Sequence, residues 1–111
     1  MCLDKKDFWT KKYKTGWKVL RTGPEGLETP YLYFPVETGK WLVDSRKERL
    51  GYYPNRYKTG FHFYIHKADA ELVSVTYGVV KKVKVEKITA SGMQDDRRVA
   101  IAKKIFIVED S

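Results

Sequence analysis

The chain has 111 residues, of which 42% are hydrophobic and 14% aromatic. That length fits one domain with its own core and is too short for two, and the aromatic content argues against a disordered chain. Its 22 Lys and Arg residues outnumber its 14 Asp and Glu residues, so the formal net charge is +8 and anionic partners are favoured. A lone Cys2 cannot form an internal disulfide, and no apolar run approaches the roughly 20 residues of a membrane span. We therefore predict a soluble cytoplasmic protein with no membrane partner.

Positive charge is concentrated near the start of the chain. Residues 1–21 contain seven basic and two acidic residues, which gives them +5 of the total +8. We predict a basic N-terminal arm over residues 1–15, either extended or as a short helix. Residues 16–21, GWKVLR, alternate in the manner of a first strand. Residues 22–30 hold two Gly and two Pro, so we predict a loop there.

The next segment is aromatic and then basic. Residues 31–36 and 40–43 are short apolar or aromatic stretches, which indicate a hairpin or an irregular aromatic loop. Pro35 would restrict any strand here to a sheet edge. Residues 44–58 interleave Arg and Lys with three tyrosines. We predict a long exposed loop, either irregular throughout or with a helical turn around residues 45–50.

A strand that carries both histidines leads into a helix between residues 57 and 70. The face expected to meet the core is apolar and consists of Phe61, Phe63 and Ile65. The other face is polar, is a candidate site, and consists of His62, Tyr64 and His66. This assignment follows from the period of two in a strand. The helix is predicted over Lys67–Val75.

The C-terminal part of the chain predicts two further strands. Residues 79–88 alternate valines with charged residues, as in a half-buried strand, and residues 90–97 predict a turn around Gly92. Residues 98–108 are apolar on both faces, which indicates a central strand that pairs with the preceding one as a hairpin. The predicted fold is α+β, with a small, mainly antiparallel β-sheet and one or two short helices in a single domain, 1–111.

The sequence gives little support for a metal site or for a catalytic nucleophile. His62 and His66 are four residues apart on an extended segment, roughly 13 Å, which one zinc ion cannot span. No HExxH, CxxC or nucleophile-elbow pattern occurs. We therefore expect no metal, no cofactor and no complete catalytic motif, while an acid–base or phosphate-ester role for His62 with Tyr64 remains an alternative.

Aromatic residues next to cations are the stronger lead. Single-stranded nucleic acids and nucleotides are bound by rings that stack on bases and by cations that contact phosphates. The candidate ligand-binding residues are Lys18, Arg21, Tyr53, Arg56, Tyr57, His62, Tyr64, Lys82 and Lys84. The alternative is that the rings fill a small core and the cations form its solvated rim.

Several short motifs resemble a group of small, uncharacterised bacteriophage and bacterial proteins. They are Met1-Cys2-Leu3, the WKVLR segment, Gly60-Phe61-His62 with its following helix, and VAIAKKIFIV near the end. This resemblance implies an accessory or host-takeover protein that acts in the host cytoplasm, and it implies no particular activity.

A fainter resemblance is to ADP-ribosyltransferase-like folds, in which elements of this kind surround NAD. Arg21 matches the first-strand Arg of that pattern, and residues 60–70 resemble its middle strand and helix. The third element departs from the pattern, because Gln94-Asp95-Asp96 places Asp where the catalytic Glu belongs.

Three functions are therefore predicted. The first is a non-enzymatic protein that binds nucleic acid, a nucleotide or a nucleic-acid-associated host complex through a basic, aromatic-rich face. The second is an NAD-using or phosphate-ester-processing enzyme with Arg21, His62 and Asp96 in its site. The third is a protein-binding inhibitor or assembly factor that uses an exposed aromatic patch.

Overall fold

A computed structural model describes residues 5–7, 12–23, 26–28, 36–44, 49–50, 57–58 and 60–108. The strands are β1 (Lys5–Lys6), β2 (Thr15–Gly23), β3 (Gly26–Glu28), β4 (Trp41–Val43), β5 (Arg49–Leu50), β6 (Tyr57–Lys58), β7 (Phe61–Tyr64), β8 (Val79–Gln94) and β9 (Arg97–Ile107). The helix of the described residues is α1 (Lys67–Tyr77), which connects β7 to β8. It is too short and too polar to cross a membrane.

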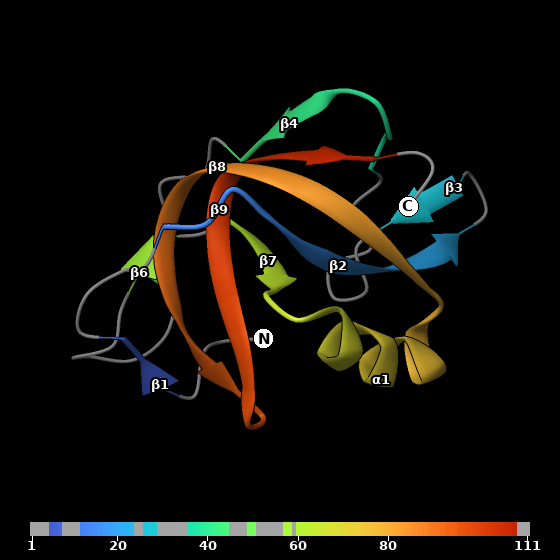
Figure 1. Ribbon diagram of the computed structural model, residues 1–111. Helices are drawn as coiled ribbons and strands as arrows, with labels where there is room; N and C mark the ends of the chain where they lie inside the picture. Colours follow the sequence, from blue (N-terminus) through green and yellow to red (C-terminus); the bar gives the residue numbers. More distant parts are fainter. Residues whose placement is uncertain are drawn as a thin grey trace.

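Strands β8 and β9 form a long antiparallel hairpin around which the other strands are arranged (Figure 1). Strand β8 also pairs with β1 and β2, and β9 also pairs with β4 and β7. Every pairing among the described strands is antiparallel. The predictions of a mainly antiparallel sheet with a short helix, of a C-terminal hairpin and of a central last strand are confirmed.

Four of the strands form a closed circuit of pairings. Strand β8 pairs with β2, β2 with β7, β7 with β9, and β9 again with β8. The β2–β7 seam is the narrowest of these contacts, since it has one registered pair, Trp17 with Tyr64. Figure 1 shows β8 and β9 curving strongly to make this closure. The curvature coincides with a register shift between Ile88 and Ala90 and with a positive φ of 57° at Lys87, because a bulge bends a strand and increases its twist.

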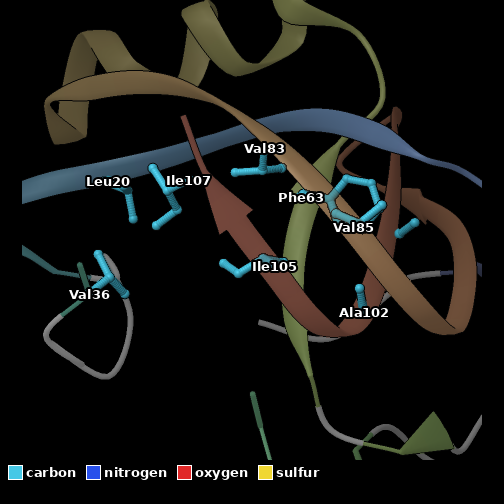
Figure 2. Close-up of a cluster of buried hydrophobic side chains, with 9 residues drawn as sticks. Leu20, Val36, Phe63, Val83, Val85, Ala102, Ile105 and Ile107 are labelled. Carbon is cyan, nitrogen blue, oxygen red and sulfur yellow. The ribbon is translucent and has the colours of Figure 1, made fainter. Parts of the chain in front are cut away.

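The interior of this closed sheet holds the main hydrophobic core. Its buried side chains, most of them labelled in Figure 2, are Leu20, Val36, Phe63, Val83, Val85, Ala100, Ala102, Ile105 and Ile107. Phe61 and Ile65 pack against this cluster, so the predicted apolar face of β7 is confirmed. Burial of large apolar side chains of this kind is the main favourable contribution to folding.

The hairpin turn lies further along the chain than predicted. The sequence places it at residues 90–97 around Gly92, but β8 continues to Gln94, and Gly92 is buried in the strand opposite Val99. The chain reverses at Asp95 and Asp96, with φ angles of 50° and 62°. Two successive positive φ angles match the right-handed twist of a hairpin, and Asp tolerates them better than most residues do.

Two predicted loops contain short strands instead. Residues 22–30 include β3, which pairs with the end of β2, and residues 44–58 include β5 and β6, which pair with each other. A strand of two or three residues is too short to show a period of two, and its formation depends on pairing with another strand. The sequence pattern therefore does not predict it. Residues 41–43 form β4 at a sheet edge, and it pairs with β9.

Helix α1 is two residues longer than predicted and ends at a glycine. Gly78 has a φ of 138°, and its N–H donates to the Ser74 carbonyl at 2.9 Å. A side chain at Gly78 would also meet the Leu20 carbonyl oxygen at 2.8 Å. The sequence predicts an apolar helix face of Ala68, Leu72 and Val75, but Ala68 and Leu72 are exposed, and Ala70 is fully buried instead.

Candidate functional site

The solvent side of the sheet carries a continuous set of cations and rings. Residues paired directly across antiparallel strands share a face. One row of such pairs runs from Thr15 on β2 to Lys84 on β8, Phe106 on β9 and Trp41 on β4. Neighbouring rows contain the pair Trp17 with Lys82, and the set Glu86, Lys104 and Val43. We call these residues the outer face: Thr15, Trp17, Trp41, Val43, Lys82, Lys84, Glu86, Lys104 and Phe106.

Alternate residues of β8 point to opposite sides of the sheet, and this explains why the outer face is open to solvent. Val83 and Val85 are buried in the core, while Lys82, Lys84 and Glu86 between and beside them are exposed. The strand has a period of two, so burial of the valines forces the charged residues outward. Lys82 and Lys84, which the sequence selects as ligand-binding candidates, therefore lie together on one accessible surface.

Aromatic rings lie directly beside these lysines. The Nζ of Lys84 is 5.3 Å from the centroid of the Phe106 ring, and the Phe106 and Trp41 centroids are 5.7 Å apart at an interplanar angle of 60°. Trp41 is 40% exposed, which is high for a large aromatic residue. A cation over a ring at this distance is stabilised by about 0.5–1 kcal/mol at an exposed site. The centre of the outer face is thus a row of lysine, phenylalanine and tryptophan side chains.

The first residue of α1 adds a second ring–cation pair. Lys67 places its Nζ 5.0 Å from the centroid of the Trp17 ring. The same ammonium lies 3.9 Å from the Glu71 carboxylate, one helical turn away. With Lys67 and Glu71 included, four lysines accompany two acidic residues, Glu71 and Glu86, among the described residues in and beside the outer face. The electrostatic potential of this surface is therefore positive.

Lys18 does not belong to this surface. It is 6% exposed, and its Nζ donates a hydrogen bond of 2.7 Å to the His62 carbonyl oxygen. This bond connects β2 to β7 beside their single registered pair. Desolvation by burial lowers the pKa of the Lys18 ammonium to about 8. The expectation that Lys18 contacts phosphate is therefore corrected, because its charge is inside the fold.

The polar face of β7 is partly covered. Tyr64 packs against a second buried cluster formed by Ala90, Val99 and Ile101, and the Nε2 atom of His62 is buried. Strands β2 and β9 pair with the two edges of β7. His62 and Tyr64 are half-buried, so their role as ligand contacts stays a prediction, while His66 is exposed at the start of α1.

Of the remaining ligand-binding candidates, the structure describes the side chain of Arg21 alone. Arg21 lies on β2 opposite Glu28 of β3. Tyr57 lies on β6, where side chains are not described, and Tyr53 and Arg56 fall outside the described residues. Asp96 lies in the β8–β9 turn, and Figure 1 shows that turn on a different side of the molecule from the β2–β3 end that carries Arg21. The described structure does not assemble Arg21 and Asp96 into a transferase-like site.

The candidate ligand-binding residues selected from the sequence do not include Trp41, Lys67, Lys104 or Phe106, although the Lys103-Lys104 pair fits a basic sheet face. The alternation of Lys104 and Phe106 with the buried Ile105 and Ile107 is visible in the sequence. It shows that these two residues share a face. What it does not show is that β4 and β8 flank β9 and bring Trp41 and Lys84 to either side of Phe106.

A separate polar cluster attaches the N-terminal strand. Asp7 Oδ2 accepts hydrogen bonds from Arg98 Nη1 at 2.6 Å and from the buried Ser91 Oγ at 2.7 Å, and the Asp7 N–H donates to the Ser91 carbonyl at 2.8 Å. These contacts hold the end of β1 against the β8–β9 hairpin, so we assign the cluster a structural role. Within the described parts of the chain, no three His, Cys, Asp or Glu residues are grouped as metal ligands.

Comparison of the chain with protein-family models, with curated proteins and with solved structures gave no match in any of the three. The resemblance to bacteriophage proteins and the fainter one to ADP-ribosyltransferase-like folds stay predictions. The functional assignment therefore depends on the geometry of the outer face.

Proposed function

We propose that this protein is a non-enzymatic binding protein that engages nucleic acid or a nucleotide through the outer face. The observation that carries the proposal is the row Lys84–Phe106–Trp41. In this row the Phe106 ring lies between the exposed Lys84 ammonium and the exposed Trp41 ring. Phosphates and bases together require this combination of positive charge and flat apolar surface.

The lysines supply the electrostatic part of binding. Lys82, Lys84 and Lys104 come from adjacent strands and share one face, so a phosphodiester chain across that face meets several ammonium groups. Each phosphate that a lysine neutralises releases counterions. For a single strand, each such contact adds about 0.7 to the salt slope, which is the steepness with which the logarithm of affinity falls against the logarithm of salt concentration. Three contacts imply that affinity falls by about twentyfold between ~50 and ~200 mM salt.

The enzyme alternative has less support. Its three residues come from β2, β7 and the β8–β9 turn, and the Nε2 atom of His62 is buried. A protein partner would use the same exposed rings but would depend less on the lysines, so the two binding hypotheses differ in their response to charge removal.

The test is a titration of a fluorescein-labelled, mixed-sequence oligonucleotide, followed by fluorescence anisotropy at several salt concentrations. The variant Lys82→Gln/Lys84→Gln should weaken binding and should reduce the salt slope by roughly 1.5. The matched control is Glu86→Gln, which has the same strand, face and amide product but removes a negative charge, so it should bind more tightly. Affinity that is independent of salt, or equal changes in the two variants, would refute the proposal.

A further inference from the structure

We infer that the outer face binds single-stranded nucleic acid, with Trp41 stacking on an unpaired base while Lys84 and Lys104 contact the flanking phosphates. This inference depends on the proposed function and specifies the form of nucleic acid that the face accepts.

Trp41 is the ring best placed for stacking. It is 40% exposed at the sheet edge, whereas Phe106 beside it is half-buried and has the Lys84 ammonium over its ring. The tilted contact with Phe106 at 5.7 Å supports the indole from one side. A ring that is supported in this way loses little conformational entropy when a base stacks on it.

Both lysines lie on the inner side of that ring, on the two strands β9 and β8 that follow β4 in the sheet, where a backbone can pass them. Lys104 is opposite Val43, two residues along β4 from Trp41, and Lys84 lies across Phe106 from Trp41. Adjacent strands are about 4.8 Å apart, so the row from β2 to β4 spans ~14 Å. That width accommodates a short run of nucleotides, and the positive charge complements their phosphates.

The arrangement favours an unpaired strand over a duplex. Within a duplex both faces of each base are covered by stacking, so an exposed ring on the surface of a sheet has no base face to contact. Duplex readers insert a helix or a two-stranded ribbon into a groove, whereas Trp41, Phe106 and Lys84 lie in a row across neighbouring strands of one sheet. Proteins that present rings and cations on such a surface bind strands whose bases are splayed out.

The first experiment compares one labelled oligonucleotide of about 15 nucleotides, alone and annealed to its complement, at ~50 mM salt. We expect the single strand to bind at least tenfold more tightly. Trp41→Ala should weaken single-strand binding by about tenfold, while Trp41→Phe should retain most of it. Leu72→Ala, which truncates an exposed apolar side chain on α1, is the matched control and should change nothing.

A second measurement needs no variant. A single strand that carries 5-iodouracil, irradiated in complex with the wild-type protein, should crosslink to an aromatic side chain that stacks on it. Trypsin cleaves after Lys40 and Arg46, so a crosslink at Trp41 appears by mass spectrometry on the peptide 41–46. Crosslinks confined to other peptides would overturn the assignment of Trp41 even if Trp41→Ala failed to fold.

The outcomes separate this inference from the proposed function. Equal or tighter duplex binding that still responds to Lys82 and Lys84 would overturn the single-strand inference and leave nucleic-acid binding in place. Unchanged single-strand affinity in Trp41→Ala would overturn the stacking role. Absence of binding to either form at low salt would overturn both.

Discussion

The buried ammonium of Lys18 makes a measurable contribution to the pH dependence of stability. Its pKa is lowered from 10.5 to about 8 by desolvation, so between these values the unfolded chain holds a proton that the folded protein has released. Stability rises with pH wherever the unfolded state binds more protons. The free energy of unfolding should therefore increase from about pH 8 to about pH 10.5, and below pH 8 this increment is absent.

The size of this pH-dependent increase in stability follows from the lowering of the Lys18 pKa. One pKa unit corresponds to 1.36 kcal/mol, so a shift of roughly 2.5 units gives an increment of about 3 kcal/mol. The neutral amine can still donate to the His62 carbonyl oxygen, 2.7 Å away, so the rise should not be offset by loss of that bond. Lys18→Met removes the titration and also the hydrogen bond.

The assay is urea unfolding of wild type and Lys18→Met at intervals from pH 7 to pH 10, followed by circular dichroism. The stability of wild type minus that of the variant should rise with pH by up to about 3 kcal/mol, whatever its sign at pH 7. Taking the difference cancels the titration of other groups. Lys82→Met, which removes an exposed lysine from the neighbouring strand, is the control and should lack this rise. A difference for Lys18→Met that stays flat or falls would refute the claim that the ammonium is buried and charged at neutral pH.

Three further predictions concern stability. Gly60→Ala should lower it by about 1–3 kcal/mol in urea unfolding, because the new Cβ would lie 2.6 Å from a backbone carbonyl oxygen of β9; an unchanged midpoint would contradict this close approach. Asp96→Gly should raise the melting temperature, with a gain of about 1 kcal/mol, because its φ of 62° is easier for glycine; a lower melting temperature would show that the Asp side chain stabilises the turn. Asp7→Ala should cost about 1–3 kcal/mol, since it leaves the buried Ser91 hydroxyl and the Arg98 guanidinium without their shared acceptor, and it should speed hydrogen exchange in β1; unaltered exchange there would show that the cluster does not hold the strand.

Local periodicity was sufficient to predict several elements. The alternation of valines and lysines after Gly78 indicated a half-buried strand, and the structure has β8 there with Val83 and Val85 inside. The apolar stretch near the end of the chain indicated a central strand, and β9 has three partners. These predictions succeed because side-chain orientation in a strand depends on sequence neighbours alone.

The sequence alone did not identify the site, because residues far apart in the chain form it. Lys18 and Lys82 have similar local contexts, yet closure of β2 onto β7 buries the first and leaves the second in water. Trp41 becomes a candidate ligand contact only because β4 pairs with β9 next to Phe106. The sequence determined the positive charge, the abundance of rings and which residues alternate along each strand. The tertiary structure decided which cations reach solvent and which rings lie beside them, because strand pairing and burial depend on contacts between distant segments.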